Sequence, residues 1–291
     1  MSPLANPWGT KHRVGLVPYL NAKPIGFGLT SGRQQGRFEV IEKVPSALAE
    51  SLGRLEVEYA LIPSIEYARA ANAGRDIAIV PGIAIVTRGK AESVLFLSRV
   101  PVAEIRTVAL DRSSRTAVGL LRLLFRRRLR PGAPEPEWQF TSPDLTMMLE
   151  SSDAALLIGD KALFAPRDFP ALMSHLTVLD LGEEWSAMTG LPFVYAFWAG
   201  VPRDDSPSVV AALQDSLEEG MSSTTAIARE HCGGNPATES LIRRYLSRTI
   251  GYSLGSEEIK GVEAYYRLLA EERLLERAPG SLRFHAHSRR H

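Results

Sequence analysis

The sequence predicts an α/β protein with mainly parallel strands. Short apolar runs alternate with amphipathic segments along the chain, which is the pattern of strands that alternate with helices. The length of 291 residues corresponds to about two domains at roughly 150 residues each, enough to bury a full core without disulfides. Hydrophobic residues make up 45% and charged residues 23%, as in a folded globular protein, so disorder and fibrous repeats are excluded.

Ten apolar runs are expected to form the strands. They span residues 13–17, 38–44, 57–62, 77–80, 93–98, 107–110, 137–140, 154–158, 177–181 and 193–199. A capping side chain before a proline marks three helix starts, at Ser142, Ser206 and Asn235, because proline suits the first helical position. A further helix is expected from Ser256 to about residue 275, and the polar segment 278–291 is expected to be a loose tail.

The two domains are expected to be discontinuous in sequence. No long linker rich in Pro, Gly or Ser divides the chain, so the chain is expected to cross between domains near residues 98–101 and to return near residues 197–202. We therefore predict an outer α/β lobe of residues 1–99 plus 198–291 and an inserted α/β lobe of residues 100–197. Such an arrangement forms a cleft between the lobes, which is a preferred place for small-ligand sites.

The charge balance argues against nucleic acid as a partner. Lys and Arg number 34 and Asp and Glu 33, which leaves a formal net charge of +1 and no broad positive field. Five arginines fall within residues 122–130, but apolar residues recur beside them at helical spacing. These arginines are therefore expected to form the solvated face of a helix.

Neither a metal site nor a membrane span is predicted. The one cysteine, Cys232, allows no internal disulfide and no multi-cysteine metal site, and the histidines lack ligand spacing. No apolar stretch is long enough to cross a bilayer, and none near the N-terminus has the length of a signal peptide. The protein is therefore expected to be cytoplasmic.

A candidate anion site follows the predicted strand at residues 107–110. The run Ser113-Ser114-Arg115-Thr116 carries three hydroxyls and an arginine at the start of a predicted helix. Free backbone N–H groups and the positive dipole end of a helix bind a carboxylate or phosphate readily, and arginine adds a bidentate clamp. The alternative is that Ser113 or Ser114 is only a helix N-cap.

Two further loops follow predicted strands and are candidates for the same site. Tyr19 and Asn21 come after the strand at 13–17, and Asp160 comes after the strand at 154–158. In open parallel α/β sheets the ligand lies beyond the carboxyl ends of the strands, where both loops fall. Two alternatives stay open, namely that Asn21 is only a turn residue and that Asp160 only caps the following helix.

Six segments, in order from about residue 13 to 275, together resemble the chorismate dehydratases of the futalosine route to menaquinone. They are Tyr19-Leu20-Asn21 with Lys23-Pro24, residues 62–67, residues 93–98, Ser113-Ser114-Arg115-Thr116, residues 157–160, and residues 185–198 with Thr189-Gly190-Leu191-Pro192-Phe193. Pro18 and Ala22 depart from the loop that is usual in this family.

The resemblance implies a type II periplasmic-binding-protein-like fold, with two α/β lobes around a ligand cleft. It also implies a hydro-lyase that removes water from chorismate to give 3-enolpyruvylbenzoate, with no metal and no cofactor. Asn21 and Asp160 are the expected catalytic residues. The expected substrate-binding residues are Tyr19, Ser64, Ser93, Ser113, Ser114, Arg115, Thr116 and Phe193.

The implied chemistry leaves the base open. The proton on ring carbon 3 of chorismate lies one vinylogous step from the ring carboxylate, and loss of the hydroxyl on carbon 4 then makes the ring aromatic. The enolpyruvyl carboxylate of the substrate is expected to take this proton, with Asn21 orienting that carboxylate or the leaving hydroxyl, and Asp160 is the alternative base.

Two other functions also stay open. One is the sister enzyme that makes 1,4-dihydroxy-6-naphthoate, and the other is a cytoplasmic carboxylate-binding protein of the same fold without turnover. In each case the partner is a small molecule, and the protein is expected to be a monomer or a homodimer.

Overall fold

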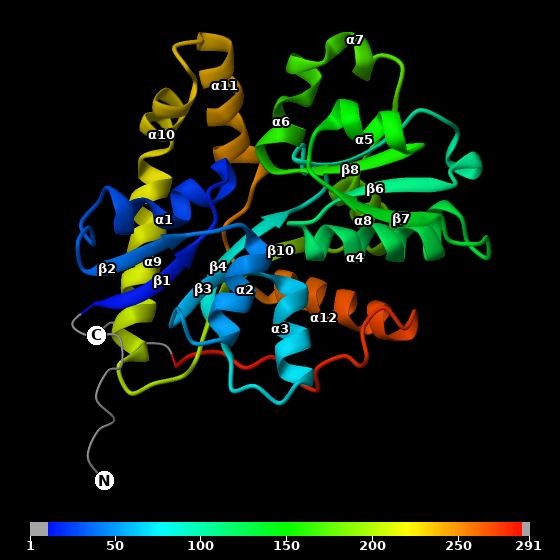
Figure 1. The fold of residues 1–291 in the computed structure, drawn as a ribbon. Coiled ribbons are helices and arrows are strands. Elements are labelled where there is room, and N and C mark those ends of the chain that lie inside the picture. Colours follow the sequence, from blue (N-terminus) through cyan, green and yellow to red (C-terminus); the bar gives the residue numbers. More distant parts are fainter. Residues whose placement is uncertain (1–10, 287–291) are drawn as a thin grey trace.

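The computed structural model describes residues 11–286, which form two α/β lobes, each built on a five-stranded sheet (Figure 1). The strand order is β2-β1-β3-β10-β4 in the first sheet and β7-β6-β8-β5-β9 in the second. All ten predicted strands are present, which confirms the alternation of apolar runs as the main signal for this fold.

The first lobe takes its sheet from both halves of the chain. Its strands are β1 (His12–Leu16), β2 (Phe38–Glu42), β3 (Tyr59–Pro63), β4 (Ala78–Thr87) and β10 (Phe193–Gly200). Its helices are α1 (Lys23–Thr30), α2 (Pro45–Gly53), α3 (Ser64–Asn72), α9 (Ser206–Ser222), α10 (Thr224–His231), α11 (Pro236–Arg244) and α12 (Ser256–Glu271). Helices α1 and α9 pack on one face of the sheet, and α2, α3 and α12 lie on the other (Figure 1).

The second lobe is continuous in sequence. Its strands are β5 (Val94–Ser98), β6 (Thr107–Asp111), β7 (Glu137–Thr141), β8 (Ala154–Ile158) and β9 (Thr177–Asp180). Its helices are α4 (Arg115–Leu124), α5 (Leu145–Ser151), α6 (Gly159–Asp168), α7 (Pro170–Met173) and α8 (Leu181–Thr189). Helices α5, α6 and α7 cover one face of the sheet, and α4 on the other face packs against α3 and α12 of the first lobe (Figure 1).

Strands β5 and β10 correct the prediction of mainly parallel sheets. β10 pairs antiparallel with β3 and β4, and β5 pairs antiparallel with β8 and β9. The other pairs are parallel. β1 pairs with β2 and β3, and β6 pairs with β7 and β8. The chain enters each sheet from the other lobe along β5 and β10, so these strands run against the strands of the βαβ units.

The same two strands place the chain crossings earlier than the expected boundaries at 99/100 and 197/198. All of β5 belongs to the second sheet, and all of β10 belongs to the first. The crossings therefore fall between Thr87 and Val94 and between Thr189 and Phe193.

Side-chain capping confirms one of the three predicted helix starts in detail. Asn235 accepts hydrogen bonds from the backbone N–H groups of Ala237 and Thr238 at 2.9 and 3.1 Å. At α5 the cap is Asp144, two residues after Ser142, and at α9 Ser206 is itself the first helical residue. The prolines located these helices, while the choice of capping side chain depended on neighbouring polar residues.

The segment after α12 docks on the first sheet, so the prediction of a loose tail is wrong for the described part of it. The N–H of Ile79 donates to the carbonyl of Arg283 at 2.8 Å, and the N–H of His285 donates to the carbonyl of Ile79 at 2.9 Å. The N–H of Arg283 also donates to the Tyr67 hydroxyl at 2.8 Å. This short parallel bridge covers the edge of β4, whose backbone groups would otherwise be unpaired.

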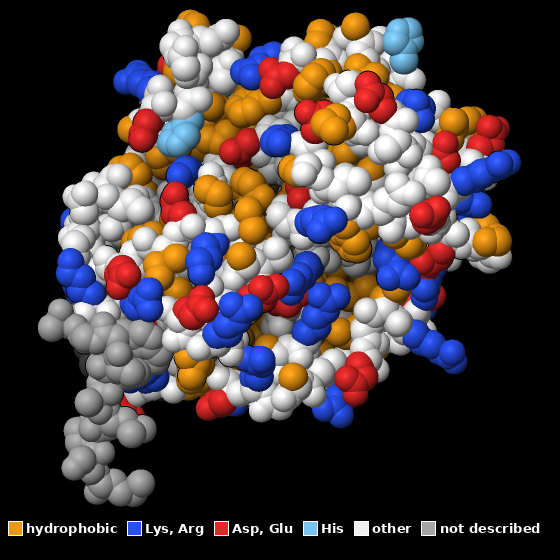
Figure 2. All heavy atoms as spheres, in the orientation of Figure 1, with side chains coloured by type: hydrophobic (Ala, Val, Ile, Leu, Met, Phe, Trp, Pro, Cys, Tyr) orange, Lys and Arg blue, Asp and Glu red, His pale blue; other side chains and the backbone are white. Residues whose placement is uncertain are grey.

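Most of the arginines between 122 and 130 pair with carboxylates at the surface. The partners are Glu135 for Arg122 and Arg126, Glu271 for Arg127 and Glu184 for Arg128. Over the face in Figure 2, Lys and Arg side chains are interspersed with Asp and Glu. These observations support the interpretation of the arginine run as a solvated helix face.

Candidate active site

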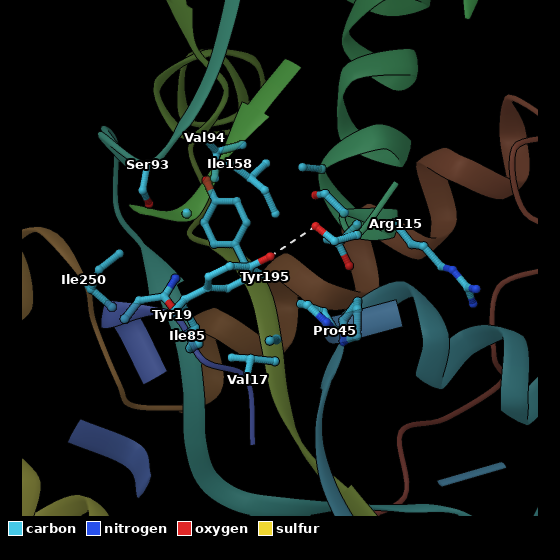
Figure 3. Close-up of a pocket in the computed structure, with 18 residues that line it drawn as sticks. Val17, Tyr19, Pro45, Ile85, Ser93, Val94, Arg115, Ile158, Tyr195 and Ile250 are labelled. Atoms are coloured by element: carbon cyan, nitrogen blue, oxygen red, sulfur yellow. Dashed lines mark hydrogen bonds between the residues drawn. The ribbon is translucent and has the colours of Figure 1, made fainter. Parts of the chain in front are cut away.

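A pocket lies between the two lobes, where loops from both sheets meet (Figure 3). Seven of the predicted site residues line it: Tyr19, Asn21, Ser93, Ser113, Ser114, Arg115 and Thr116. The apolar wall is formed by Val17, Pro45, Pro63, Ile85, Val94, Ala117, Ile158, Ala196 and Ile250. The loops after β1, β6 and β8 meet here because the carboxyl ends of these strands face the other lobe.

Two tyrosines point into the pocket. Figure 3 shows the rings of Tyr19 and Tyr195 between the apolar side chains. Gly159 has a φ of +64°, and a Cβ there would lie 3.2 Å from Cδ1 of Tyr19, so the ring packs directly on the backbone of the second lobe. A flat ligand ring therefore meets aromatic and apolar surface in the middle of the pocket.

The Tyr19 hydroxyl joins the two lobes through Ser113. Their oxygens lie 3.1 Å apart, and the Ser113 hydroxyl donates to Oδ1 of Asp111 at 2.7 Å. Since the single hydroxyl hydrogen of Ser113 is used in this way, Tyr19 is the donor to Ser113. Burial raises the pKa of Tyr19, which keeps this donor protonated at neutral pH.

One end of the pocket is the N-terminus of α4, which we call the α4 end. The first backbone N–H groups of this ten-residue helix have no acceptor within the helix. Ser114 makes no side-chain capping bond, and Oγ1 of Thr116 accepts from the N–H of Ile65 at 3.3 Å, which leaves its hydrogen for a ligand. These donors at the positive end of the helix dipole can hold a carboxylate.

Arg115 does not supply the predicted anion clamp in this structure. Its guanidinium binds Glu50 at 2.7 Å and Glu66 at 3.1 Å, both from the first lobe. Figure 3 shows the side chain extending away from the pocket. Two carboxylates from α2 and α3 hold this cation, so Arg115 joins the two lobes.

The opposite end of the pocket contains Asn21 and Ser93, and we call it the Asn21 end. Figure 3 shows Ser93 and Ile250 on one side of the pocket and Arg115 and Pro45 on the other. Asn21 belongs to a 3-10 turn, Leu20–Ala22, after β1. Its Oδ1 is buried and has no hydrogen-bond partner among residues 11–286. At the same end, the buried Tyr245 hydroxyl donates to Oγ of Ser93 at 2.7 Å.

Three predicted site residues lie outside the pocket lining. Asp160 is in the first turn of α6, and its Oδ1 accepts from the N–H of Leu20 at 3.0 Å, while burial raises its pKa. Ser64 is buried and donates to the carbonyl of Val194 at 2.8 Å. Phe193 is 1% exposed and packs in the aromatic core, 5.2 Å from the Trp185 ring.

Sequence reasoning missed Tyr195 and Tyr245. Tyr195 stands near the amino end of β10, and such an end faces the cleft only because this strand is antiparallel. Tyr245 begins a π-helical turn, Tyr245–Thr249, that continues α11. A π-turn is often found at a functional site, but the apolar spacing of this segment in the sequence is that of an ordinary helix.

Within residues 11–286, no three His, Cys, Asp or Glu side chains are grouped so that they could hold a metal ion. None of the helices described is long and apolar enough to cross a membrane.

Two α/β lobes around a pocket define a protein with the periplasmic-binding-protein fold. The alkanesulfonate-binding protein of Xanthomonas axonopodis pv. citri, solved bound to MOPS, superposes with a TM-score of 0.65 at 17% identity, over 91% of this chain and 94% of that chain. An Archaeoglobus fulgidus protein superposes with a TM-score of 0.69 at 18% identity, over 91% and 99%. A Candida albicans protein described as having this generic fold gives 0.58 at 13% identity, over 91% and 90%.

Within this fold, the chain belongs to the family described as menaquinone biosynthesis, whose model matches residues 12–271. A chorismate dehydratase of Thermus thermophilus is 28% identical over 268 residues, which cover 88% of this chain and 94% of the relative. The family resemblance and the fold predicted from the sequence are thereby confirmed.

Proposed function

We propose that this protein is a chorismate dehydratase, a hydro-lyase that converts chorismate to 3-enolpyruvylbenzoate and water. The menaquinone biosynthesis family and the similarity to a chorismate dehydratase support this function. The observation that carries the proposal is that the described pocket lining includes no Asp, Glu, His or Lys. Such a pocket suits a substrate that brings its own base, as chorismate does with its enolpyruvyl carboxylate.

The two ends of the pocket match the two ends of the chorismate ring. The ring carboxylate on carbon 1 and the hydroxyl on carbon 4 are para to each other, so they lie at opposite ends of the bound ring. The ring carboxylate binds at the α4 end, where Ser114, Thr116 and the first N–H groups of the helix are donors. The carbon 4 hydroxyl then lies at the Asn21 end, where Asn21 and Ser93 line the pocket.

The reaction needs one proton transfer and the loss of one hydroxyl. The enolpyruvyl carboxylate takes the proton from carbon 3, and the electron pair of that C–H bond delocalises toward the ring carboxylate at the α4 end. The C–O bond at carbon 4 then breaks and the ring becomes aromatic. The departing hydroxide takes up the proton that the enolpyruvyl carboxylate removed, so water leaves and the carboxylate is ionised again. The protein contributes orientation and stabilises the charge that develops on the ring carboxylate.

Asp160 is assigned a supporting role and not the role of base. Its carboxylate accepts the N–H of Leu20 and lies outside the pocket lining. Since Leu20 precedes Asn21 in the same 3-10 turn, this bond from the second lobe fixes the loop that carries Asn21.

Turnover tests the proposal. Purified protein is incubated with chorismate without added metal or cofactor, and the new aromatic absorbance is followed, with product identification by chromatography and mass spectrometry. We expect one product that is lighter than chorismate by one water. Binding of chorismate without turnover would instead indicate a carboxylate-binding protein, and no binding would contradict the proposal altogether.

A further inference from the structure

Asp180 is a buried carboxylate that the proposed reaction does not use. It is the last residue of β9 in the second lobe and is 9% exposed. Its Oδ1 accepts from the N–H of Gly182 at 2.9 Å and from the N–H of Glu183 at 3.3 Å, so Asp180 is the N-cap of α8. One oxygen is enough for this cap, and the other oxygen is available to a second segment of the chain.

That second segment is the first of the two chain crossings, residues 88–93, between β4 and β5. Oδ2 of Asp180 accepts from the N–H of Glu92 at 2.7 Å, and both carboxylate oxygens accept from the N–H of Ala91, at 2.9 and 3.0 Å. A Cβ at Gly182 would lie 2.5 Å from the carbonyl oxygen of Gly89, so the first turn of α8 packs directly on the crossing. We call the bonds from Asp180 to residues 91 and 92 the Asp180 clasp.

The crossing ends at Ser93, which lines the Asn21 end of the pocket. The Ser93 hydroxyl donates to the carbonyl of Ala91 at 3.3 Å, so its side chain is tied to a residue that the clasp holds. The carbonyl of Ser93 accepts from the N–H of Gly159 at 2.8 Å, on the backbone against which the Tyr19 ring packs. The position of the crossing therefore determines the shape of this end of the pocket.

Glu92, directly before Ser93, has a left-handed backbone conformation. Its φ is +59°, which is uncommon for a residue with a side chain and persists only where the surrounding structure imposes it. Two contacts do so here. The N–H of Glu92 is held by Asp180, and its carboxylate accepts from both terminal nitrogens of Arg244, at 2.6 and 2.8 Å.

We propose that Asp180 is a positioning residue, which holds Ser93 in its place in the pocket through the backbone of residues 91 and 92. The proposal rests on the proposed function, in which the Asn21 end orients the reacting groups of the substrate. Without the clasp, Glu92 can relax to an ordinary conformation, which shifts the chain at Ser93. Such a shift misorients the reacting groups and leaves the donors at the α4 end in place.

The first test is Asp180→Asn, which separates the clasp from the helix cap. An asparagine preserves the cap, as Asn235 does in α11, where one amide oxygen accepts from two backbone N–H groups. The amide NH₂ group replaces Oδ2, so a donor faces the N–H of Glu92 and the clasp is lost. The matched control is Asp144→Asn, because Asp144 is exposed and caps α5 through the N–H of Met147 at 3.0 Å.

Kinetics and amide hydrogen exchange are measured on both variants. We expect Asp180→Asn to lower kcat about tenfold and to change KM less than about threefold, while Asp144→Asn keeps wild-type kinetics. Exchange in Asp180→Asn should become faster in residues 88–93 and stay unchanged in α8. The proposal is overturned by wild-type kcat in Asp180→Asn, by an effect on KM alone, by unchanged exchange in the crossing, or by equally faster exchange in α8.

A second variant covers the case in which Asp180→Asn fails to fold, which thermal melting identifies. Asp180→Ser supplies an efficient N-cap, but its single oxygen on a shorter side chain cannot also bind the crossing. The same results are expected of it, and the same outcomes overturn the proposal. Hydrogen exchange needs no substrate, so it tests the clasp independently of the reaction. A wild-type protein that leaves chorismate unchanged would refute the proposed function, a result distinct from these.

Discussion

The two ends of the pocket hold their polar groups in different ways. At the α4 end, Ser114 makes no capping bond and the first N–H groups of the helix lack acceptors, so several donors can adjust to one anion. At the Asn21 end, the hydrogens of Ser93 and Tyr245 are both donated to protein acceptors, and the amide oxygen of Asn21 is buried without a partner among the described residues. In the proposed function, the α4 end provides affinity for a carboxylate, while the Asn21 end orients the reacting groups of the substrate.

The largest expected effect comes from Asn21→Asp. The new carboxylate cannot donate a hydrogen bond as the amide can, and its charge repels the enolpyruvyl carboxylate, which is the proposed base. We expect turnover to fall by more than about 100-fold, with a smaller loss for Asn21→Ser, which adds no charge. Chromatography of the products measures both variants and shows whether Asn21→Asp diverts chorismate to hydrolysis of its enol ether. Wild-type turnover in both would reduce Asn21 to a turn residue.

Two substitutions of Asp160 distinguish a catalytic base from a residue that only supports the loop of Asn21. Asp160→Asn keeps an oxygen acceptor for the N–H of Leu20 and is expected to retain kcat within about threefold. Asp160→Ala leaves this N–H without an acceptor, which costs about 1 to 3 kcal/mol of stability. We expect this variant to lower kcat/KM about tenfold. Loss of all turnover in Asp160→Asn would identify Asp160 as the base.

The raised pKa of Asp160 adds a test of stability. Burial raises its folded pKa above the unfolded value of about 3.9, so the folded state binds more protons between these two values. The contribution of this group to the free energy of unfolding is therefore present at low pH and is lost as the pH rises through that window. The melting temperature of Asp160→Asn relative to that of the wild type should increase as the pH rises above about 4. A decrease would contradict the unfavourable burial of the ionised carboxylate.

A smaller effect is expected at the α4 end. Ser114→Ala removes one of several donors to the ring carboxylate and should raise KM about fivefold, which corresponds to about 1 kcal/mol, with kcat nearly unchanged. Ser151→Ala is the control, since that hydroxyl donates to the carbonyl of Met147 in its own helix, α5. If Ser114→Ala lowered kcat and left KM unchanged, the α4 end would not be an affinity site.

The smallest effect is expected from Arg115→Ala. A clamp on the substrate would cost about 1.5 to 3 kcal/mol of affinity. The observed pairs with Glu50 and Glu66 instead join the lobes, and the Arg115 side chain is 33% exposed. We therefore expect Arg115→Ala to reduce the free energy of substrate binding by less than about 1 kcal/mol, and we expect this loss to depend on the salt concentration. Arg69→Ala is the control, because Arg69 pairs with Glu66 within α3. A loss of tenfold or more in affinity for Arg115→Ala alone would restore the predicted clamp.

Most of the fold and about half of the site could be predicted from the sequence. The strands were recognisable because buried runs such as Val94–Ser98 are apolar except for their last residue. The loops with Asn21 and Ser113 were recognisable because they follow such strands. The direction of β5 and β10 depends on which lobe the chain comes from, and local pattern carries no such information. For this reason the contribution of Tyr195 was not predicted.

The direction in which the site side chains point was the second feature that could not be predicted from the sequence. Arg115 was correctly placed at a helix start, but its partners Glu50 and Glu66 are far away in sequence and become neighbours only when the lobes meet. Asp160 was placed near the pocket, and its bond to Leu20 again crosses the lobes. The role of a charged residue between two lobes therefore follows from the tertiary arrangement and not from its motif.

A crystal structure with bound 3-enolpyruvylbenzoate tests the two-ended pocket most directly. We expect the ring carboxylate within hydrogen-bond distance of Ser114, Thr116 and the first N–H groups of α4. The ring should lie beside Tyr19 and Tyr195, with ring carbon 4 toward Asn21 and Ser93. The reverse orientation, with the ring carboxylate against Asn21 and Ser93 and carbon 4 toward α4, would contradict the account.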